Sequence, residues 1–228
     1  MNARLIECLA AVYLVLFLSG CGRLIDWGTN TFYQGETLEE HNKDAWRFVR
    51  WGAVYDQLET RAIFDAIWLS DDVRTAYAHL FMSRQGKSEE HHTAFLRRQL
   101  EENNHFITFY VLSLYKIPLG DPESAWSLFL DVDGKQVLPL EIKAVDLPQE
   151  FQTFFGKRFT RFKDAYLVKF DARDVEEHPF ITKDTQVIAL NFKTIDKQLV
   201  LSWKFGPDGR VMDQPMTGGV PKFIYPKK

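Results

Sequence analysis

The sequence predicts an α+β protein whose core is an antiparallel β-sandwich of immunoglobulin-like architecture, with a helical segment before the strands or inserted among them. The first observation is a change in the spacing of apolar residues, from about four to two, beyond Asn103 and Asn104. The second is a set of segments rich in aromatic and β-branched residues, which predict strands over 105–115, 125–132, 136–144, 165–171, 186–195 and 198–205. The third is Asp133 followed by Gly134, a two-residue hairpin signal between two of these segments.

The residues before these strands contain a helix signal. Thr37 followed three residues later by Glu40 is a capping-box pattern, in which the two side chains bond free backbone amides at a helix start. A helical spacing continues from there to about Gly52. We therefore expect a helix over 38–52.

A strand followed by two helices is expected next. Residues 60–69 alternate between two sets of side chains, which fits a strand, although their apolar residues also fit a helix. The strand is favoured because Ser70 and the two aspartates after it form an N-cap and an acidic first turn. The sequence thus predicts helices over 71–102, with a stop at Gly86.

The N-terminal residues have the pattern of a secretory signal. A short charged start precedes an apolar run over 8–18, which is too short to span a membrane unaided. Residues 18–21, Leu-Ser-Gly-Cys, resemble the lipobox of bacterial lipoproteins, in which the cysteine is acylated before cleavage in front of it. The resemblance implies a signal peptide over 1–20 and a lipid on Cys21. An uncleaved N-terminal membrane anchor is the alternative.

This signal defines the expected domain organisation and location. We expect a lipidated tether over 21–36 and one globular domain over 37–228, with the sandwich mainly in 105–225. Acyl chains would hold the protein at the cell envelope. Gly22 stands where the enterobacterial sorting rule reads aspartate as an inner-membrane retention signal. We therefore expect the outer membrane, with the domain facing the periplasm.

Composition excludes several function classes. A net charge of -3 in 228 residues gives no basic excess, so we expect no nucleic-acid partner. Cys8 leaves with the signal and Cys21 carries the lipid, so no thiol is left for a disulfide, a metal site or a nucleophile. The sequence contains no phosphate-binding loop, dinucleotide-binding glycine pattern, nucleophile elbow or zinc-protease helix motif. We expect no cofactor.

Two Glu-x-x-His pairs are the metal-ligand candidates: Glu89 with His92, and Glu102 with His105. Residues three apart share a helix face, and carboxylate-bridged di-iron proteins use two such pairs from facing helices. Here the pairs lie on one predicted helix and its end, which places them roughly 140° apart around the helix axis. A charged helix face in solvent, with no metal bound, is the interpretation we favour.

The segment 151–163 combines aromatic and basic residues at near-helical spacing. Its candidate surface-binding residues are Phe151, Phe154, Phe155, Lys157, Arg158, Phe159, Arg161 and Phe162. A basic amphipathic element of this kind can dock on an anionic membrane or on a partner. The alternative is a crossover segment between strands, whose phenylalanine face closes one end of the sandwich.

Residues 55–61 and 68–77 resemble the opening of uncharacterised predicted lipoproteins of Gram-negative bacteria. The resemblance covers about a quarter of the chain. It implies a strand that leads into a capped helix, in a domain that faces the periplasm. It implies no catalytic residue and no known activity.

These observations predict a lipid-anchored envelope protein that acts as a non-enzymatic interaction or structural module, with an envelope protein or polymer as its partner. One alternative is an envelope hydrolase that uses carboxylates and histidines, among them His79, His91, His92 and His105. Another is a glycan or small-ligand binder that uses exposed tryptophans and tyrosines. We expect Trp126 and Trp203, at strand positions, to pack in the core.

Overall fold

The structure is a computed structural model. It describes residues 45, 47–56, 59–86, 89–115 and 117–212, and the backbone of 222–223. These residues belong to one compact unit, Asn42–Lys228. They form an α+β structure in which two antiparallel sheets pack as a sandwich with three added α-helices, which confirms the predicted fold class. The predicted signal, lipid site and tether at 1–36 lie outside the described residues.

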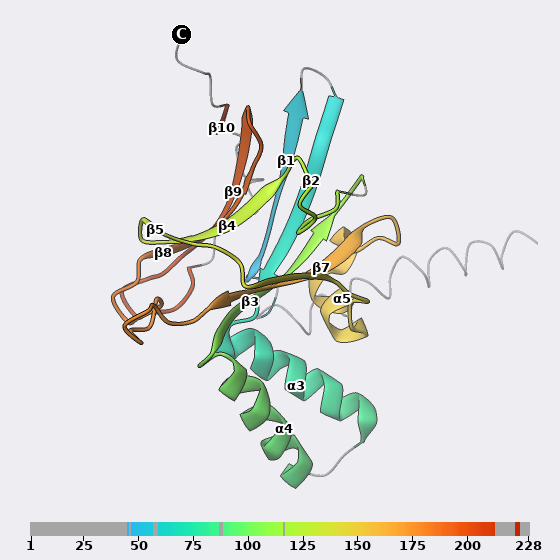
Figure 1. Cartoon of the computed structure of the whole chain (residues 1–228). Coiled ribbons are helices and arrows are strands. Elements are labelled where there is room, and N and C mark those ends of the chain that lie inside the picture. Colours follow the sequence, from blue (N-terminus) through green and yellow to red (C-terminus); the bar gives the residue numbers. More distant parts are fainter. Residues whose placement is uncertain are drawn as a thin grey trace, which may run out of the picture. The chain divides into compact units, whose positions relative to one another are not determined.

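The first sheet has the strand order β1-β2-β3-β7-β6 among the described residues, and all neighbours are antiparallel (Figure 1). Its strands are β1 (Val49–Asp56), β2 (Glu59–Trp68), β3 (Phe106–Ser113), β6 (Glu141–Ala144) and β7 (Asp164–Asp171). β2 and β3 are neighbours in the sheet, although the chain forms two helices between them. The helical segment is therefore inserted between adjacent strands.

The second sheet has the order β10-β9-β8-β4-β5 in the described part of the chain. Its strands are β4 (Ser127–Val132), β5 (Lys135–Val137), β8 (Val187–Lys193), β9 (Lys197–Lys204) and β10 (Lys222–Phe223). The turn between β4 and β5 has positive φ at both Asp133 (47°) and Gly134 (91°), as the hairpin signal predicts. The Asp133 carboxylate also accepts hydrogen bonds from the amides of Gln186 and Val187, which ties this turn to β8.

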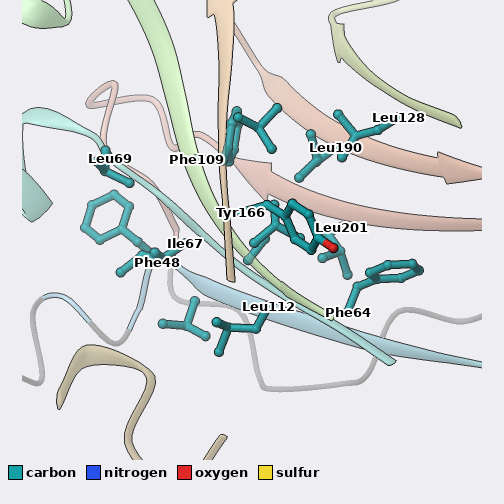
Figure 2. Close-up of a cluster of buried hydrophobic side chains, with 14 of the residues drawn as sticks. Phe48, Phe64, Ile67, Leu69, Phe109, Leu112, Leu128, Tyr166, Leu190 and Leu201 are labelled. Atoms are coloured by element: carbon teal, nitrogen blue, oxygen red, sulfur yellow. The ribbon is translucent and has the colours of Figure 1, made fainter. Parts of the chain in front are cut away.

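The core lies between the two sheets, where Figure 2 shows Phe64, Phe109, Leu190 and Leu201 gathered from strands of both sheets. The ring of Phe64 in β2 stacks on that of Phe192 in β8, with centroids 4.1 Å apart. Trp203 in β9 is fully buried against Phe109, and its indole Nε1 donates a hydrogen bond to the Phe48 carbonyl. Burial of Trp203 confirms the prediction, whereas Trp126 is half-buried.

The two inserted helices are α3 (Asp71–Gln85) and α4 (Glu89–Glu102), and both are as predicted. The Ser70 hydroxyl accepts a hydrogen bond from the Val73 amide, so the N-cap forms. Gly86 adopts the left-handed conformation (φ 60°) that ends α3. In Figure 1 the two helices extend side by side away from one end of the sheets.

A third helix, α5 (Gln149–Phe155), continues as a 3-10 helix (Gly156–Arg158) and links β6 to β7. It covers the face of the first sheet that points away from the second. On that face the Phe151 ring packs against Tyr110 of β3 and against Tyr77 of α3. The buried carboxylate of Glu150 pairs with Arg84 of α3 at 2.7 Å. α5 therefore holds α3 against the sheet.

The predicted helix over 38–52 is wrong from residue 49 onward, because β1 begins at Val49. The pairing of Val49 with Ile67 starts a ladder along β2, and this ladder outweighs the local helical pattern. Gly52 also lies so close to β9 that an added Cβ would stand 2.5 Å from a methyl group of Leu199. Most of the rest of the predicted helix lies outside the described residues.

Two further strand boundaries differ from the prediction. The single strand expected over 136–144 is two strands, β5 and β6, in different sheets. Pro139, which has no amide hydrogen to donate to a ladder, lies in the break where the chain crosses between the sheets. The sandwich also begins before residue 105, because β1 and β2 belong to it.

Candidate binding cleft at the helical end of the sandwich

A cleft of about 1280 Å³ lies at the end of the sandwich, where the start of α3 and the end of α4 meet the sheets. One part of the cleft lining, which we term the helix wall, consists of residues 93–104, in α4 and the turn after it, and of the first turn of α3. The loops 172–183 and 205–211, which follow β7 and β9, line another part, the loop wall. These segments are far apart in the sequence and meet only in the folded chain.

The floor of the cleft is aromatic. Trp68, the last residue of β2, is half-buried between Phe48 and Phe205. Its ring meets both neighbours edge to face, with centroids 6.2 Å from Phe48 and 5.8 Å from Phe205. Aromatic pairs in this geometry hold each other in place beyond the effect of their burial. Trp68 and Phe205 thus form an apolar surface that solvent still reaches, and the buried Phe48 ring supports it.

One face of α4 lines the cleft, and another face packs against α3. Phe95 of α4 packs against Tyr77 and Phe81 of α3. Leu96 and Leu100, which lie on the cleft side, are half-buried, and no residue of α4 is fully buried. The spacing of four residues puts these two leucines one above the other. α4 therefore offers an apolar stripe to the cleft.

A buried arginine fixes the base of the helix wall. Arg74 of α3 is 2% exposed, and its guanidinium donates to the side chains of Asn103 (2.6 Å), Glu102 (2.9 Å), Gln99 (3.2 Å) and Thr108 (3.4 Å). Glu102 also pairs with Lys169 of β7 at 2.8 Å. One side chain thus joins α3, the end of α4 and the sheet. This network sets the position of α4 at the cleft.

The charges around Arg74 change the acidity of Glu102. Burial raises the pKa of this carboxyl, but the hydrogen bond from Lys169 and the charge of Arg74 together outweigh burial and hold the pKa below its ordinary value. Glu102 is therefore a carboxylate that is already committed to two cations.

The four metal-ligand candidates do not converge. Glu102 pairs with Arg74 and Lys169, and His105 is exposed in the turn before β3. Glu89 and His92 are near each other, with 3.7 Å between the carboxylate and Nδ1. Across the described residues, no group of three or more histidine, cysteine or acidic side chains could hold a metal ion.

None of His79, His91, His92 and His105 lines the cleft, although His105 adjoins the lining residues Asn104 and Phe106. His79, His91 and His105 are exposed, and His92 packs its ring against that of His79 with centroids 4.4 Å apart. The described lining of the cleft contains neither histidine nor cysteine. The histidines that the hydrolase hypothesis names are therefore not among the residues that line this cleft.

The aromatic and basic segment 151–163 divides between core and surface. Phe151, Phe154 and Phe155 are buried, Phe159 is half-buried, and Lys157, Arg161 and Phe162 are exposed. Buried rings cannot meet a partner, so this burial favours the crossover interpretation over a docking surface. Of the phenylalanines of this segment, only Phe162 stands out into solvent, at 67% exposure.

The segment has a structural role that the sequence analysis missed. Asp65, in the middle of β2, is fully buried and pairs with Lys163 (2.5 Å) and Arg158 (3.2 Å). The Arg158 guanidinium lies 3.8 Å from the centre of the Trp51 ring, and Trp51 is the partner of Asp65 in the β1–β2 ladder. A lone aspartate within an apolar strand was the signal that could have revealed this site.

No known protein family matches the chain, and comparisons with curated proteins and with solved structures find no significant similarity. Within the described residues, no helix has the length and apolar character needed to cross a membrane. The cleft and its contacts are therefore the basis for a functional proposal.

Proposed function

We propose that this protein is a non-enzymatic binding module, anchored to the cell envelope by a lipid on Cys21, that holds a segment of a partner protein in the cleft. The observation that carries the proposal is the aromatic floor of Phe48, Trp68 and Phe205 beside the leucine stripe of α4. Apolar side chains that protein leaves uncovered, next to a rigid aromatic anchor, are typical of surfaces that bind other proteins.

The size and composition of the cleft favour a protein segment over a small molecule. Small-molecule sites are mostly enclosed and occupy about 300–1,000 Å³. This cleft, at about 1280 Å³, is larger, and charged residues of both signs surround its apolar floor. An apolar centre with a polar rim is the usual anatomy of protein interfaces.

The anchor supports the same function by confining the domain to a surface. Two or three acyl chains anchor a protein stably to a membrane, so partners at that surface would meet the cleft at a high effective concentration. If Cys21 is acylated, an alkyne-tagged palmitate fed to cells will label the protein, and Cys21→Ser will remove the label. Cys8→Ser is the matched control and should keep it. Equal labelling of the Cys21→Ser protein would contradict the anchor.

Site-specific photocrosslinking tests the binding module. A benzoylphenylalanine at Leu100, in the cleft, should give a defined protein adduct in the native envelope, because its ring would lie against the bound segment. The same probe at Ile195, which is fully exposed at the β8–β9 turn, is the control and should not give this adduct.

A second substitution shows whether the adduct depends on the cleft. Leu96→Glu places a charge in the apolar stripe one turn away and should reduce the Leu100 adduct by about tenfold, as loss of an interface anchor does. The circular dichroism spectrum should be unchanged, since Leu96 is only half-buried. An adduct of equal yield with and without Leu96→Glu would overturn the proposed function.

A further inference from the structure

We propose, on the basis of the proposed function, that the segment held in the cleft is an acidic amphipathic helix. The inference rests on which charges at the cleft already have partners. Acidic side chains lie mainly on the helix wall and basic side chains mainly on the loop wall. The two walls differ in how far their charged side chains are already neutralised by nearby residues of opposite charge.

The acidic groups of the helix wall are already compensated. Asp72 pairs with Arg47 at 2.7 Å, and Glu101 pairs with Arg97 one turn earlier at 3.0 Å. Asp71 accepts a hydrogen bond from the side-chain amide of Asn103 at 2.7 Å. Asp71 also stands in the first turn of α3, where the free backbone amides favour negative charge. A cationic ligand would therefore find little unbalanced negative charge on this wall.

The basic groups of the loop wall are less well compensated. Lys183 and Arg210 are exposed, and their side chains have no ion-pair partner among the described residues. Arg173 donates a hydrogen bond to the Glu177 carbonyl at 3.3 Å, and its charge is only weakly paired, 3.9 Å from the exposed carboxylate of Glu177. The acidic residue of this wall, Asp208, accepts a hydrogen bond from the Arg210 backbone amide, which fixes it within its own turn. Among the loop-wall side chains that line the cleft, Arg173, Lys183 and Arg210 thus outnumber the single acidic residue Asp208, so the unbalanced charge that faces the cleft is positive.

The apolar surface sets the form of the ligand. The cleft-lining residues Thr93, Leu96 and Leu100 repeat every three to four positions along about two turns of α4, a length of roughly 11 Å, and Asn104 follows in the turn after the helix. A second helix can pack its own apolar stripe against such a ridge, with side chains reaching the aromatic floor. Acidic residues on the flank of that helix would then face Lys183 and Arg210. The ligand that fits both walls is an amphipathic helix with a negative flank.

The test uses two fluorescein-labelled helical peptides of about five turns with the same leucine and phenylalanine stripe. One carries glutamate and the other lysine at all remaining positions. Fluorescence anisotropy should show that the acidic peptide binds at least about tenfold more tightly at about 50 mM salt. This preference should shrink at about 300 mM salt, because exposed charges are screened.

Charge-reversal variants locate the preference. Lys183→Glu with Arg210→Glu should abolish or reverse the preference for the acidic peptide. The matched control is Lys143→Glu with Lys193→Glu, which changes the net charge by the same amount at exposed strand positions outside the cleft lining. The control should leave the preference intact. Equal loss in both double variants would mean that only the net charge of the protein matters, and would overturn the proposal.

The outcomes separate this inference from the proposed function. Equal affinity for both peptides, with both weakened by Leu96→Glu, would keep the cleft as a binding site but overturn its preference for acidic segments. If neither peptide binds, the acidic helix is not the ligand. If, in addition, the probe at Leu100 gives no adduct, the proposed function is overturned. Vesicles that contain phosphatidylglycerol form a separate arm. If Lys183 and Arg210 are needed for vesicle binding while neither peptide binds, the ligand is a lipid surface.

Discussion

Replacing Asp65 with asparagine is expected to lower the free energy of unfolding by about 3–5 kcal/mol, the usual cost of breaking a buried ion pair. The substitution preserves the shape of the side chain and removes its charge. Lys163 and Arg158, which both pair with Asp65, would then be left without the carboxylate that offsets their removal from water. Urea denaturation should show a lower transition midpoint with an unchanged slope.

A control in the same strand separates the effect of a buried ion pair from the effect of removing one negative charge. Glu59 of β2 is exposed and stands 3.7 Å from Arg61, so Glu59→Gln should leave the urea midpoint almost unchanged. The double variant Asp65→Leu with Lys163→Met should be more stable than Asp65→Asn, because a buried pair can often be replaced by apolar side chains of similar size. Arg158, whose side chain is 23% exposed, can turn to solvent in that variant. If Asp65→Asn is as stable as the natural protein, the ion pairs of Asp65 do not hold the segment 158–163 against the sheet.

Local signals predicted the elements that depend on local contacts. Ser70 and Gly86 bound α3 as the sequence indicates, because each acts on backbone groups within one turn of the helix. The Asp133-Gly134 hairpin forms for the same reason, since its two positive φ angles are a property of the turn itself. The prediction of a strand rather than a helix for β2 was also confirmed. It rested on a local signal, the N-cap at Ser70 that begins the next helix.

The wrong or missing predictions concern elements that depend on contacts between residues far apart in the sequence. Nothing near Val49 in the sequence shows that this segment pairs with β2 and packs against Leu199 of β9. The same limit applies to the cleft, whose floor joins Phe48, Trp68 and Phe205 from three separate regions of the chain. The phenylalanines of 151–163 follow a pattern that fits both a docking surface and a crossover helix. Only the burial of Phe151, Phe154 and Phe155, with the Phe151 ring against Tyr77 and Tyr110, separates the two interpretations.

Replacing Arg74 with methionine is the second substitution with a large expected effect, again about 3–5 kcal/mol in the free energy of unfolding. Methionine fills much of the same volume but donates no hydrogen bond. The partners Asn103, Gln99 and Thr108 would lose their shared donor, and Glu102 would keep only Lys169. Because Arg74 positions α4, the affinity for the acidic peptide should also fall. Urea denaturation and anisotropy measure the two effects on one preparation.

The dependence of stability on pH gives a readout that a simple packing defect would not change. The pKa of Glu102 is lower in the folded protein than its ordinary value of 4.5, so its ion pairs stabilise the fold above that pH and this stabilisation is lost as the pH falls toward the folded-state value. Without Arg74 the pKa of Glu102 should rise. The difference in stability between the natural protein and Arg74→Met should therefore narrow as the solution is acidified below about pH 4.5.

Arg97→Met, which removes an exposed pair on α4, is the control and should show a small difference at every pH. A gap between the natural protein and Arg74→Met that stays constant with pH would mean that Arg74 acts through packing alone, and that Glu102 takes no part in fixing the wall of the cleft.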